Sequence, residues 1–168
     1  SGSVGAQNKV VKAKNAIYIG GFSESATIVS VNYDRVIFTS DIIFLSASTG
    51  FGFQPVLHNL NLEPIIGVPL NFSCNVGRKN HLLDIGFGLK YSSGLSQHEQ
   101  SNNEFYNNQL LVKRSILFNI NFGYKYQPQT GGLFFKLGYS PMYELYIIEG
   151  AELNCDYPFF SVGLGFCF

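Results

Sequence analysis

Charge is the scarcest property of this 168-residue sequence, in which Asp, Glu, Lys and Arg together make up 13%. An average soluble domain has about 25% charged residues, and a soluble surface needs at least that share. The acidic and basic residues also balance to a formal net charge of zero, and no basic run is present to attract a polyanion. The low charge argues against a soluble protein, and we expect no nucleic-acid partner.

Long apolar runs are also missing, because no stretch approaches the roughly 20 consecutive apolar residues of a membrane-spanning helix. The chain is nevertheless 46% hydrophobic and 15% aromatic, and it contains 18 glycines and no tryptophan. A chain that is too apolar for water and lacks spanning helices can satisfy its backbone in a membrane by closing a sheet. The composition therefore favours a transmembrane β-barrel.

Cysteine is sparse and has no spacing typical of metal ligands. The three cysteines, Cys74, Cys155 and Cys167, form no Cys-x-x-Cys pair. An odd number without zinc-type spacing predicts free thiols that act as small apolar residues, not a disulfide framework. We therefore expect no metal and no other cofactor.

The features that are present repeat with a period of two residues, and no segment shows the 3.6-residue stripe of a helix. One of the clearest segments alternates Leu83, Ile85 and Phe87 with Asp84 and Gly86. Strands are predicted at about 16–23, 27–38, 45–53, 68–76, 83–92, 116–126, 133–140 and 161–168. Alternating segments of about ten residues are typical of transmembrane barrel strands. The predicted fold is all-β, a closed antiparallel up-and-down transmembrane β-barrel of eight strands.

Connections of two lengths alternate along the chain. Tight connections at 39–41, 77–80 and 127–132 alternate with longer polar ones at about 54–63, 94–111 and 143–156, after a short first connection at 23–26. Outer-membrane barrels have short periplasmic turns and longer outer loops. The order predicts that both termini are periplasmic. Residues 1–15 are then a leader remnant or a periplasmic N-terminal extension, and residues 16–168 form the barrel.

The two faces of the predicted strands differ in size as well as in polarity. One face carries Phe, Leu, Ile and Tyr, and the other carries mainly Gly, Ser and Asn. A soluble barrel needs Lys and Glu on its outer face, whereas a narrow membrane barrel needs small side chains inside and apolar ones toward lipid. Outward tyrosines are predicted to form an aromatic girdle, with Tyr124 and Tyr126 near the periplasmic end and Tyr91 and Tyr139 near the outer end.

A few charges fall on the predicted inward face: Asp34, Asp84, Lys90, Lys125 and Lys136. A charge in a narrow interior is costly unless it is paired, so these residues are predicted to form an ion-pair network in the lumen. Asp84, Lys125 and Lys136 fall on adjacent strands and are expected to meet. The alternative is that the same charges line a narrow channel for ions or a small solute.

A second alternative is a lipid-modifying enzyme at the outer rim. His98 lies close in sequence to Ser96 and to Glu99 or Glu104, the residue types of an acylhydrolase or acyltransferase site. A catalytic triad needs a base that is held in place by an orienting acid. These residues lie in a segment rich in Gln, Asn and Ser, for which a solvated loop is the preferred interpretation. The chain is predicted not to be an enzyme.

The last strand carries a more specific pattern. Ser161, Gly163, Phe166 and Phe168 resemble the polar-x-Gly-x-x-apolar-x-Phe ending of Gram-negative outer-membrane barrels. The resemblance implies an assembly signal that the barrel-assembly machinery recognises during insertion. On the small face of this strand, Gly163 and Gly165 are predicted to leave room for inward side chains of the neighbouring strands.

Further segments resemble small outer-membrane barrels of the Bacteroidetes type: 17–19, 31–35, 77–81, 83–86, 123–128 and 132–136. The similarity covers nearly all predicted strands and is weak in the outer loops. It implies an outer-membrane location in contact with lipid and lipopolysaccharide. In that group Arg often stands where this chain has Lys125 and Lys136, and Lys cannot form the bidentate pair that Arg forms. We expect a non-enzymatic scaffold, or an accessory subunit of a larger outer-membrane complex.

Overall fold

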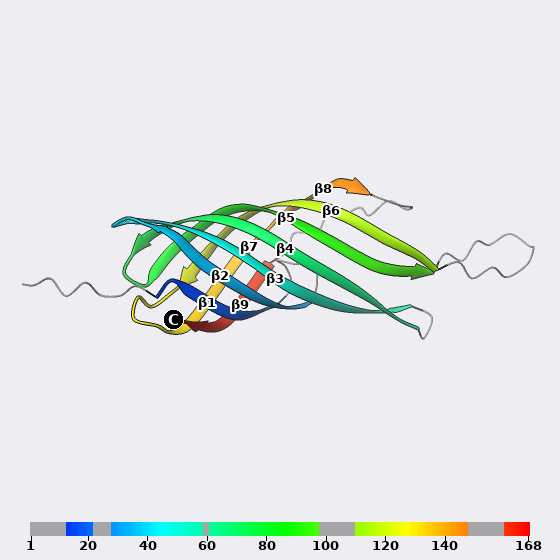
Figure 1. The fold of residues 1–168 in the computed structure, drawn as a ribbon, viewed down its shortest axis with the longest axis horizontal. Coiled ribbons are helices and arrows are strands. Elements are labelled where there is room, and N and C mark those ends of the chain that lie inside the picture. The colour runs from blue at the N-terminus through cyan, green and yellow to red at the C-terminus, as the bar shows by residue number, and fades with distance from the viewer. Residues whose placement is uncertain (1–12, 22–27, 59–60, 98–109, 148–159) are drawn as a thin grey trace, which may run out of the picture.

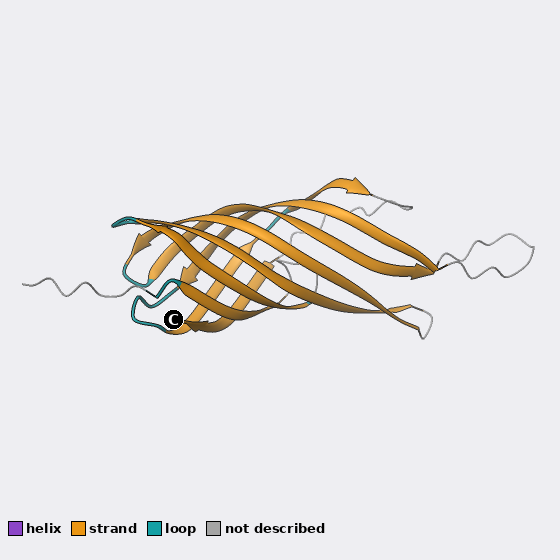
Figure 2. Ribbon diagram, viewed as in Figure 1, coloured by secondary structure: helices purple, strands orange, loops and turns teal. Residues whose placement is uncertain are grey.

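The computed structural model describes residues 13–21, 28–58, 61–97, 110–147 and 160–168. In these ranges no helix is long and apolar enough to cross a membrane. The strands are β1 (Asn15–Gly21), β2 (Val29–Thr39), β3 (Ile43–His58), β4 (Asn61–Arg78), β5 (His81–Gln97), β6 (Leu110–Tyr126), β7 (Gly132–Tyr139), β8 (Met142–Ile147) and β9 (Phe160–Cys167). Figures 1 and 2 show them as one strongly tilted sheet.

The sheet closes on itself. Each strand from β1 to β6 pairs antiparallel with the next strand in the chain, and β9 pairs with both β7 and β1. The pairing between β5 and β6 completes the ring. Closure removes the unpaired strand edges that an open sheet would present. The predicted closed, antiparallel, all-β barrel is confirmed.

The strands β7 and β8 are two parts of one barrel strand. Both pair with β6, where Phe122 is opposite Tyr139 and Asn119 is opposite Met142, so one register continues across the break. The break falls at Pro141, which has no backbone N–H to donate to the ladder. The barrel therefore has eight strands, as the sequence predicted.

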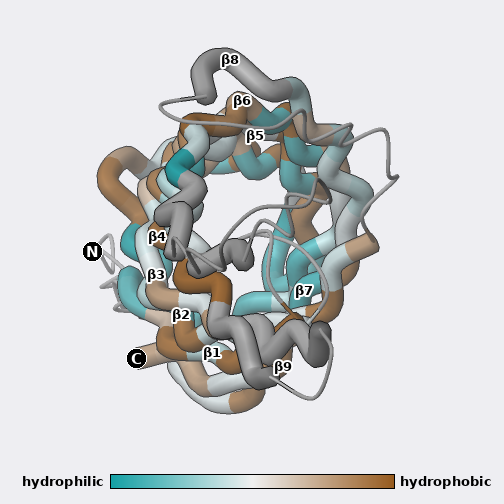
Figure 3. Tube along the Cα trace, turned by 90° about the vertical axis from the view of Figure 1, so that its right-hand side faces the viewer, coloured by the Kyte–Doolittle hydropathy of each residue, from teal (hydrophilic) through white to brown (hydrophobic). Residues whose placement is uncertain are grey.

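Side chains alternate between the outside and the inside of the barrel. In β5, Leu83 and Phe87 are each 55% exposed, whereas Asp84 between them is fully buried. Large apolar side chains on the other strands also point outward, among them Ile19, Val31, Phe51, Leu70, Leu133 and Leu164. Figure 3 shows hydrophobic and hydrophilic positions alternating along the barrel wall. The outer face has the composition expected of a surface that contacts lipid.

The strands extend further than the alternation predicted. Because β3 continues to His58 and β4 begins at Asn61, the predicted loop 54–63 is mostly a paired hairpin, and its predicted bounds were wrong. The bounds of the predicted loops 94–111 and 143–156 were also wrong, since β5, β6 and β8 extend into them.

Prolines account for the error at the β3–β4 hairpin. Pro55 of β3 is opposite Pro64 of β4. In the described residues β2 pairs with β3 as far as Phe53, and β5 pairs with β4 as far as Ile65. Each proline therefore lies where its strand has one neighbour, and an edge position tolerates proline. This hairpin projects beyond β1, β2 and β9 at the right of Figure 1.

The opposite end of the barrel, which we call the turn end, carries the short connections 40–42, 79–80 and 127–131. Residues 13–14 lie across it, because Ala13 N donates to Gln129 O at 2.6 Å and Val36 N donates to Lys14 O at 2.7 Å. The end with the projecting hairpins is called the loop end. The distinction matters because charged side chains are distributed unevenly between the two ends.

Candidate functional site in the barrel lumen

The lumen at the turn end contains two apolar clusters. They consist of Ala16, Tyr18, Phe134 and Cys167, and of Val36, Phe44 and Leu82. The rings of Tyr18 and Phe134 lie 5.0 Å apart between centroids, which is a favourable aromatic contact. These large inward residues differ from the mainly small inward face expected from the sequence. The room that Gly163 and Gly165 were predicted to leave is the space beside the Tyr18 side chain.

A buried ion pair crosses the lumen beside these clusters. Lys125 Nζ on β6 lies 2.9 Å from Asp34 Oδ2 on β2, and neither side chain is more than 3% exposed. The two strands are four positions apart in either direction around the barrel, so the pair connects opposite walls. Lys125 Nζ also donates to Ser46 Oγ on β3 at 3.4 Å and lies 5.9 Å from the centre of the Phe134 ring. The lumen is thereby bridged by side chains at this level.

A second buried ion pair lies on one side of the barrel. Lys136 Nζ on β7 is 3.0 Å from Asp84 Oδ2 on β5, so the pair spans the intervening strand β6. Lys136 is also directly opposite Lys125 in the β6–β7 register. Like charges in such a position repel, and a separate carboxylate for each lysine offsets the repulsion. Asp84 therefore pairs with Lys136. Lys125, which was expected to join them, pairs with Asp34 instead.

Lys90, the fifth predicted lumen residue, is fully buried on β5. Its ammonium group donates to the sulfur of Met142 on β8 at 3.6 Å, and a thioether is a weak acceptor. Lys90 therefore contacts the strand segment beyond Pro141, whereas the two aspartate–lysine pairs involve β2, β5, β6 and β7.

Asparagine and serine side chains occupy much of the remaining lumen. Asn121 Oδ1 accepts hydrogen bonds from Asn119 Nδ2 at 2.7 Å and from Ser140 Oγ at 2.6 Å. Asn75 Nδ2 donates to Ser46 Oγ at 2.9 Å. Such a network is rigid when its polar groups are satisfied. The network is incomplete in the described residues, because the buried Oδ1 atoms of Asn75 and Asn119 have no hydrogen-bond partner.

The terminal strand β9 requires glycine on its inner face. Gly165 is opposite Phe134 on β7 and Tyr18 on β1. A Cβ atom at Gly165 would collide with Ile17 O and lie 2.5 Å from Tyr18 Cα, and a Cβ at Gly163 would lie 2.8 Å from the Tyr18 ring. The two glycines thus leave the space that the inward Tyr18 side chain occupies.

The other residues of the predicted assembly signal take both faces of β9. Ser161 is buried, whereas Phe166 and the following Phe168 are 60% and 55% exposed on the outer surface. Phe166 lies in the ladder between Ile17 and Leu133. The pattern therefore presents aromatic side chains outside the barrel and small ones inside it.

The predicted girdle tyrosines all contribute to the outer surface. Tyr91, Tyr124 and Tyr139 are exposed, and Tyr126 is half-buried at the turn end of β6. Tyr124 OH lies 2.5 Å from Nδ1 of His81, whose ring also contacts Tyr126 at 5.3 Å between centroids. Tyrosine beside histidine at the end of an apolar wall is the arrangement expected at a membrane–water interface.

Clusters of metal-ligating side chains are absent from the residues that the structure describes. No three His, Cys, Asp or Glu side chains among them lie close enough to hold a metal ion. Cys74 and Cys167 are free thiols, and Cys155 is outside the described residues. The rim residues His98, Glu99 and Glu104 also lie outside them, so the enzyme alternative has no described geometry.

Comparison with solved structures identifies a similar fold. The crystal structure of the N-terminal β-barrel domain of Pseudomonas aeruginosa OprF matches 94% of this chain and 98% of that domain, with a TM-score of 0.52. The sequence identity is 15%, so the likeness is one of fold. No protein-family model and no curated protein sequence matches the chain. This protein therefore has the eight-stranded barrel fold of an outer-membrane domain.

Proposed function

We propose that this chain is a small, non-enzymatic integral protein of the outer membrane that acts as a scaffold or as an accessory subunit of a larger outer-membrane complex. The observation that carries the proposal is the buried Lys125–Asp34 pair, which joins opposite walls of a barrel whose outer face is apolar. An apolar exterior favours insertion into lipid. A bridged interior leaves the outer wall and the two ends as the surfaces for interaction.

The proposed orientation places the turn end and both termini in the periplasm. Short turns at one end and projecting hairpins at the other are typical of that arrangement. The outward Phe166 on β9 and the outward Phe168 that follows it support a role of the C-terminal segment as a signal for the barrel-assembly machinery. Lipid and lipopolysaccharide are then the immediate surroundings, and the segment resemblance noted above favours a Bacteroidetes-type member.

A narrow channel is the less favoured alternative. An eight-stranded barrel has an interior just wide enough for side chains to fill. Here Lys125 and Lys136 are each held by an aspartate, and Asn121 is hydrogen-bonded to two neighbours. A conducting path would have to break the cross-lumen pair, which is costly in a buried setting.

Extraction from native membranes in a mild detergent tests the proposed role. We expect the chain to elute in a stoichiometric complex with one or more outer-membrane proteins. In a matched variant, residues 55–64 are replaced by an Asn-Gly turn, which shortens the projecting hairpin and keeps the β3–β4 pairs below it. If that hairpin contributes to recognition, the variant barrel still resists extraction by salt but recovers less partner. A lone monomer at every detergent concentration would contradict the accessory-subunit role.

A further inference from the structure

The balanced net charge of this chain conceals an uneven distribution along the barrel axis. At the turn end the exposed side chains include five basic or titratable ones, Lys14, Arg35, Arg78, Lys79 and His81. We call these residues the basic belt. Asp41 is the one acidic side chain that the structure describes as exposed at this end. Among the described residues at the loop end, Arg114 is the one exposed basic side chain.

The sequence contains few acidic residues near the turn-end connections. Apart from Asp41 and the lumen aspartates, the acidic residues fall outside the connections 40–42, 79–80 and 127–131: Glu24, Glu63, Glu99, Glu104, Glu144, Glu149, Glu152 and Asp156. Surface charges of one sign that are grouped at one end act together on a charged partner, whereas a mixed surface does not. The turn end is therefore an electropositive rim.

The belt residues are held beside anchored aromatic side chains. Arg35 is opposite Asn15 in the β1–β2 register, next to Lys14, and Tyr33 OH donates to Asn15 Oδ1 at 2.7 Å. Tyr33 and Arg35 lie on the same face of β2, two residues or roughly 7 Å apart. An interfacial tyrosine sits at the headgroup level of a membrane, which places the adjacent guanidinium at the depth of lipid phosphates.

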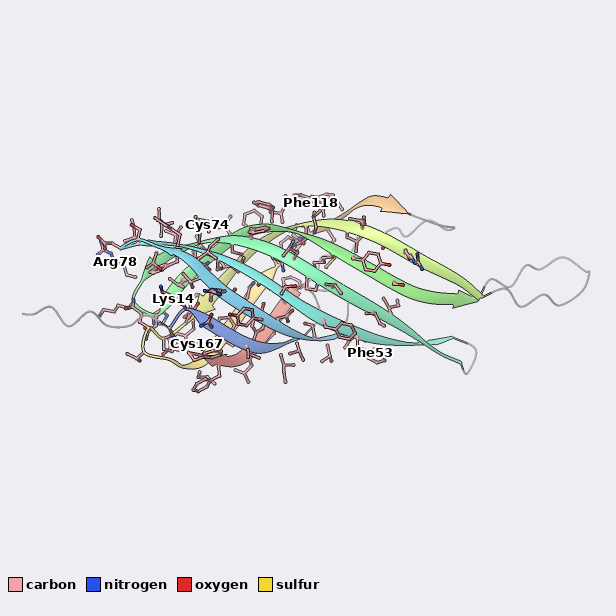
Figure 4. All side chains as sticks on the ribbon, viewed as in Figure 1. Lys14, Phe53, Cys74, Arg78, Phe118 and Cys167 are labelled. Atoms are coloured by element: carbon pink, nitrogen blue, oxygen red, sulfur yellow. The ribbon has the colours of Figure 1, made fainter. Side chains whose placement is uncertain are left out.

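The second part of the belt repeats this arrangement on β4 and β5. Arg78 and His81 are opposite each other as the last pair of the hairpin, with Lys79 in the turn between them. The His81 ring contacts both Tyr124 and Tyr126. Figure 4 shows Arg78 and Lys14 near the left of the ribbon, toward the turn end of the barrel. Basic side chains thus lie near tyrosines at two positions around the same rim: Arg35 is two residues from Tyr33, and Arg78 is opposite His81, which contacts Tyr124 and Tyr126.

We infer that the basic belt binds the headgroups of anionic phospholipids in the leaflet around the turn end. This inference rests on the proposed membrane insertion and adds a lipid preference to it. The recognised chemistry is the phosphate monoanion of a headgroup with net negative charge, such as phosphatidylglycerol. A Lys or Arg near an anionic lipid surface attracts the headgroups, and screening by salt weakens the attraction.

Spin-labelled lipids test this preference on the full chain reconstituted in phosphatidylcholine vesicles. Electron spin resonance measures the fraction of each labelled lipid that the barrel immobilises. We expect spin-labelled phosphatidylglycerol to associate about threefold more strongly than spin-labelled phosphatidylcholine, and the ratio to fall as salt is raised. The double variant R35Q/R78Q should reduce the ratio close to one while the total number of immobilised lipids stays constant, which shows that the barrel remains folded.

The matched control is R114Q, which removes an exposed arginine at the loop end. We expect it to leave the ratio unchanged, whereas R35Q or R78Q alone lowers it. Equal association of the two lipids with the wild-type barrel would overturn the inference and leave membrane insertion standing. An equal effect of R114Q would overturn it as well. Loss of the lipid preference when inorganic phosphate is added at constant ionic strength would also overturn it, because that result indicates a site for free anions. If no lipid is immobilised at all, both the inference and the proposed membrane insertion fail.

Discussion

Replacing Gly165 with alanine is expected to lower the free energy of unfolding of the barrel by about 2 kcal/mol or more. The new Cβ atom would collide with the carbonyl oxygen of Ile17 and lie 2.5 Å from Tyr18 Cα. Both are atoms of the backbone of β1, so a side-chain rotation cannot relieve the clash. The β1–β9 ladder, which closes the barrel, must separate locally. Urea titration of the folded, faster-migrating band on unheated SDS gels measures the loss.

Gly21 offers the control for this substitution, since it lies on the same seam. A Cβ at Gly21 would find its nearest atoms, Ile28 O and Val162 O, at 3.9 Å, which is ordinary contact. We expect Gly21→Ala to change stability by less than about 0.5 kcal/mol, and Gly165→Val to be worse than Gly165→Ala. Equal stability of the Gly165→Ala and Gly21→Ala barrels would show that β9 does not approach β1 as closely as described.

Removing one member of the Lys125–Asp34 pair is expected to destabilise the barrel by about 3–5 kcal/mol. In Asp34→Asn, the Lys125 ammonium stays buried without its carboxylate at 2.9 Å. In Lys125→Met, the buried Asp34 carboxylate loses its cation. The double variant leaves no uncompensated charge and should recover most of the loss. Urea unfolding of the four proteins forms a double-mutant cycle that isolates the coupling between the two side chains.

Arg114→Met on the outside of β6 serves as the comparison, because that arginine is exposed. It should change stability by less than about 1 kcal/mol. If Asp34→Asn has an effect as small as Arg114→Met, the lumen around Asp34 is well solvated. That outcome would favour the narrow channel over the bridged interior.

The architecture was readable from the sequence because a barrel wall has two faces in contact with different environments. Residues such as Leu83 and Phe87 alternate with Asp84 and Gly86, and this alternation persists wherever a strand separates lipid from lumen. The prediction stopped at Phe53, because Pro55 and Pro64 indicated a loop. The structure pairs these two prolines with each other in the β3–β4 hairpin.

The lumen was predictable in part. Inward positions of the charged residues followed from the alternation of each strand, but their partners did not. Adjacent strands bring Asp84 and Lys136 within reach, whereas the contact of Lys125 with Asp34 depends on barrel diameter and on strand tilt, which set the relative height of opposite walls. The contact between the tilted Tyr18 and Phe134 rings was not predicted for the same reason, although the glycines of β9 indicated room for inward side chains.

The claim on which the whole account depends is that the apolar outer face contacts lipid. The chain contains no tryptophan, so a single introduced tryptophan is an unambiguous reporter. Phe87→Trp places it on the outer face of β5, where the phenylalanine is 55% exposed, and Thr130→Trp places one in an exposed turn as the control. In vesicles, lipids brominated in the acyl chain should strongly quench the fluorescence of the tryptophan introduced on β5, and aqueous iodide should not. The tryptophan in the turn should be quenched by iodide and not by the brominated lipids. Quenching of the β5 reporter by iodide, with no response to brominated lipid, would contradict the account.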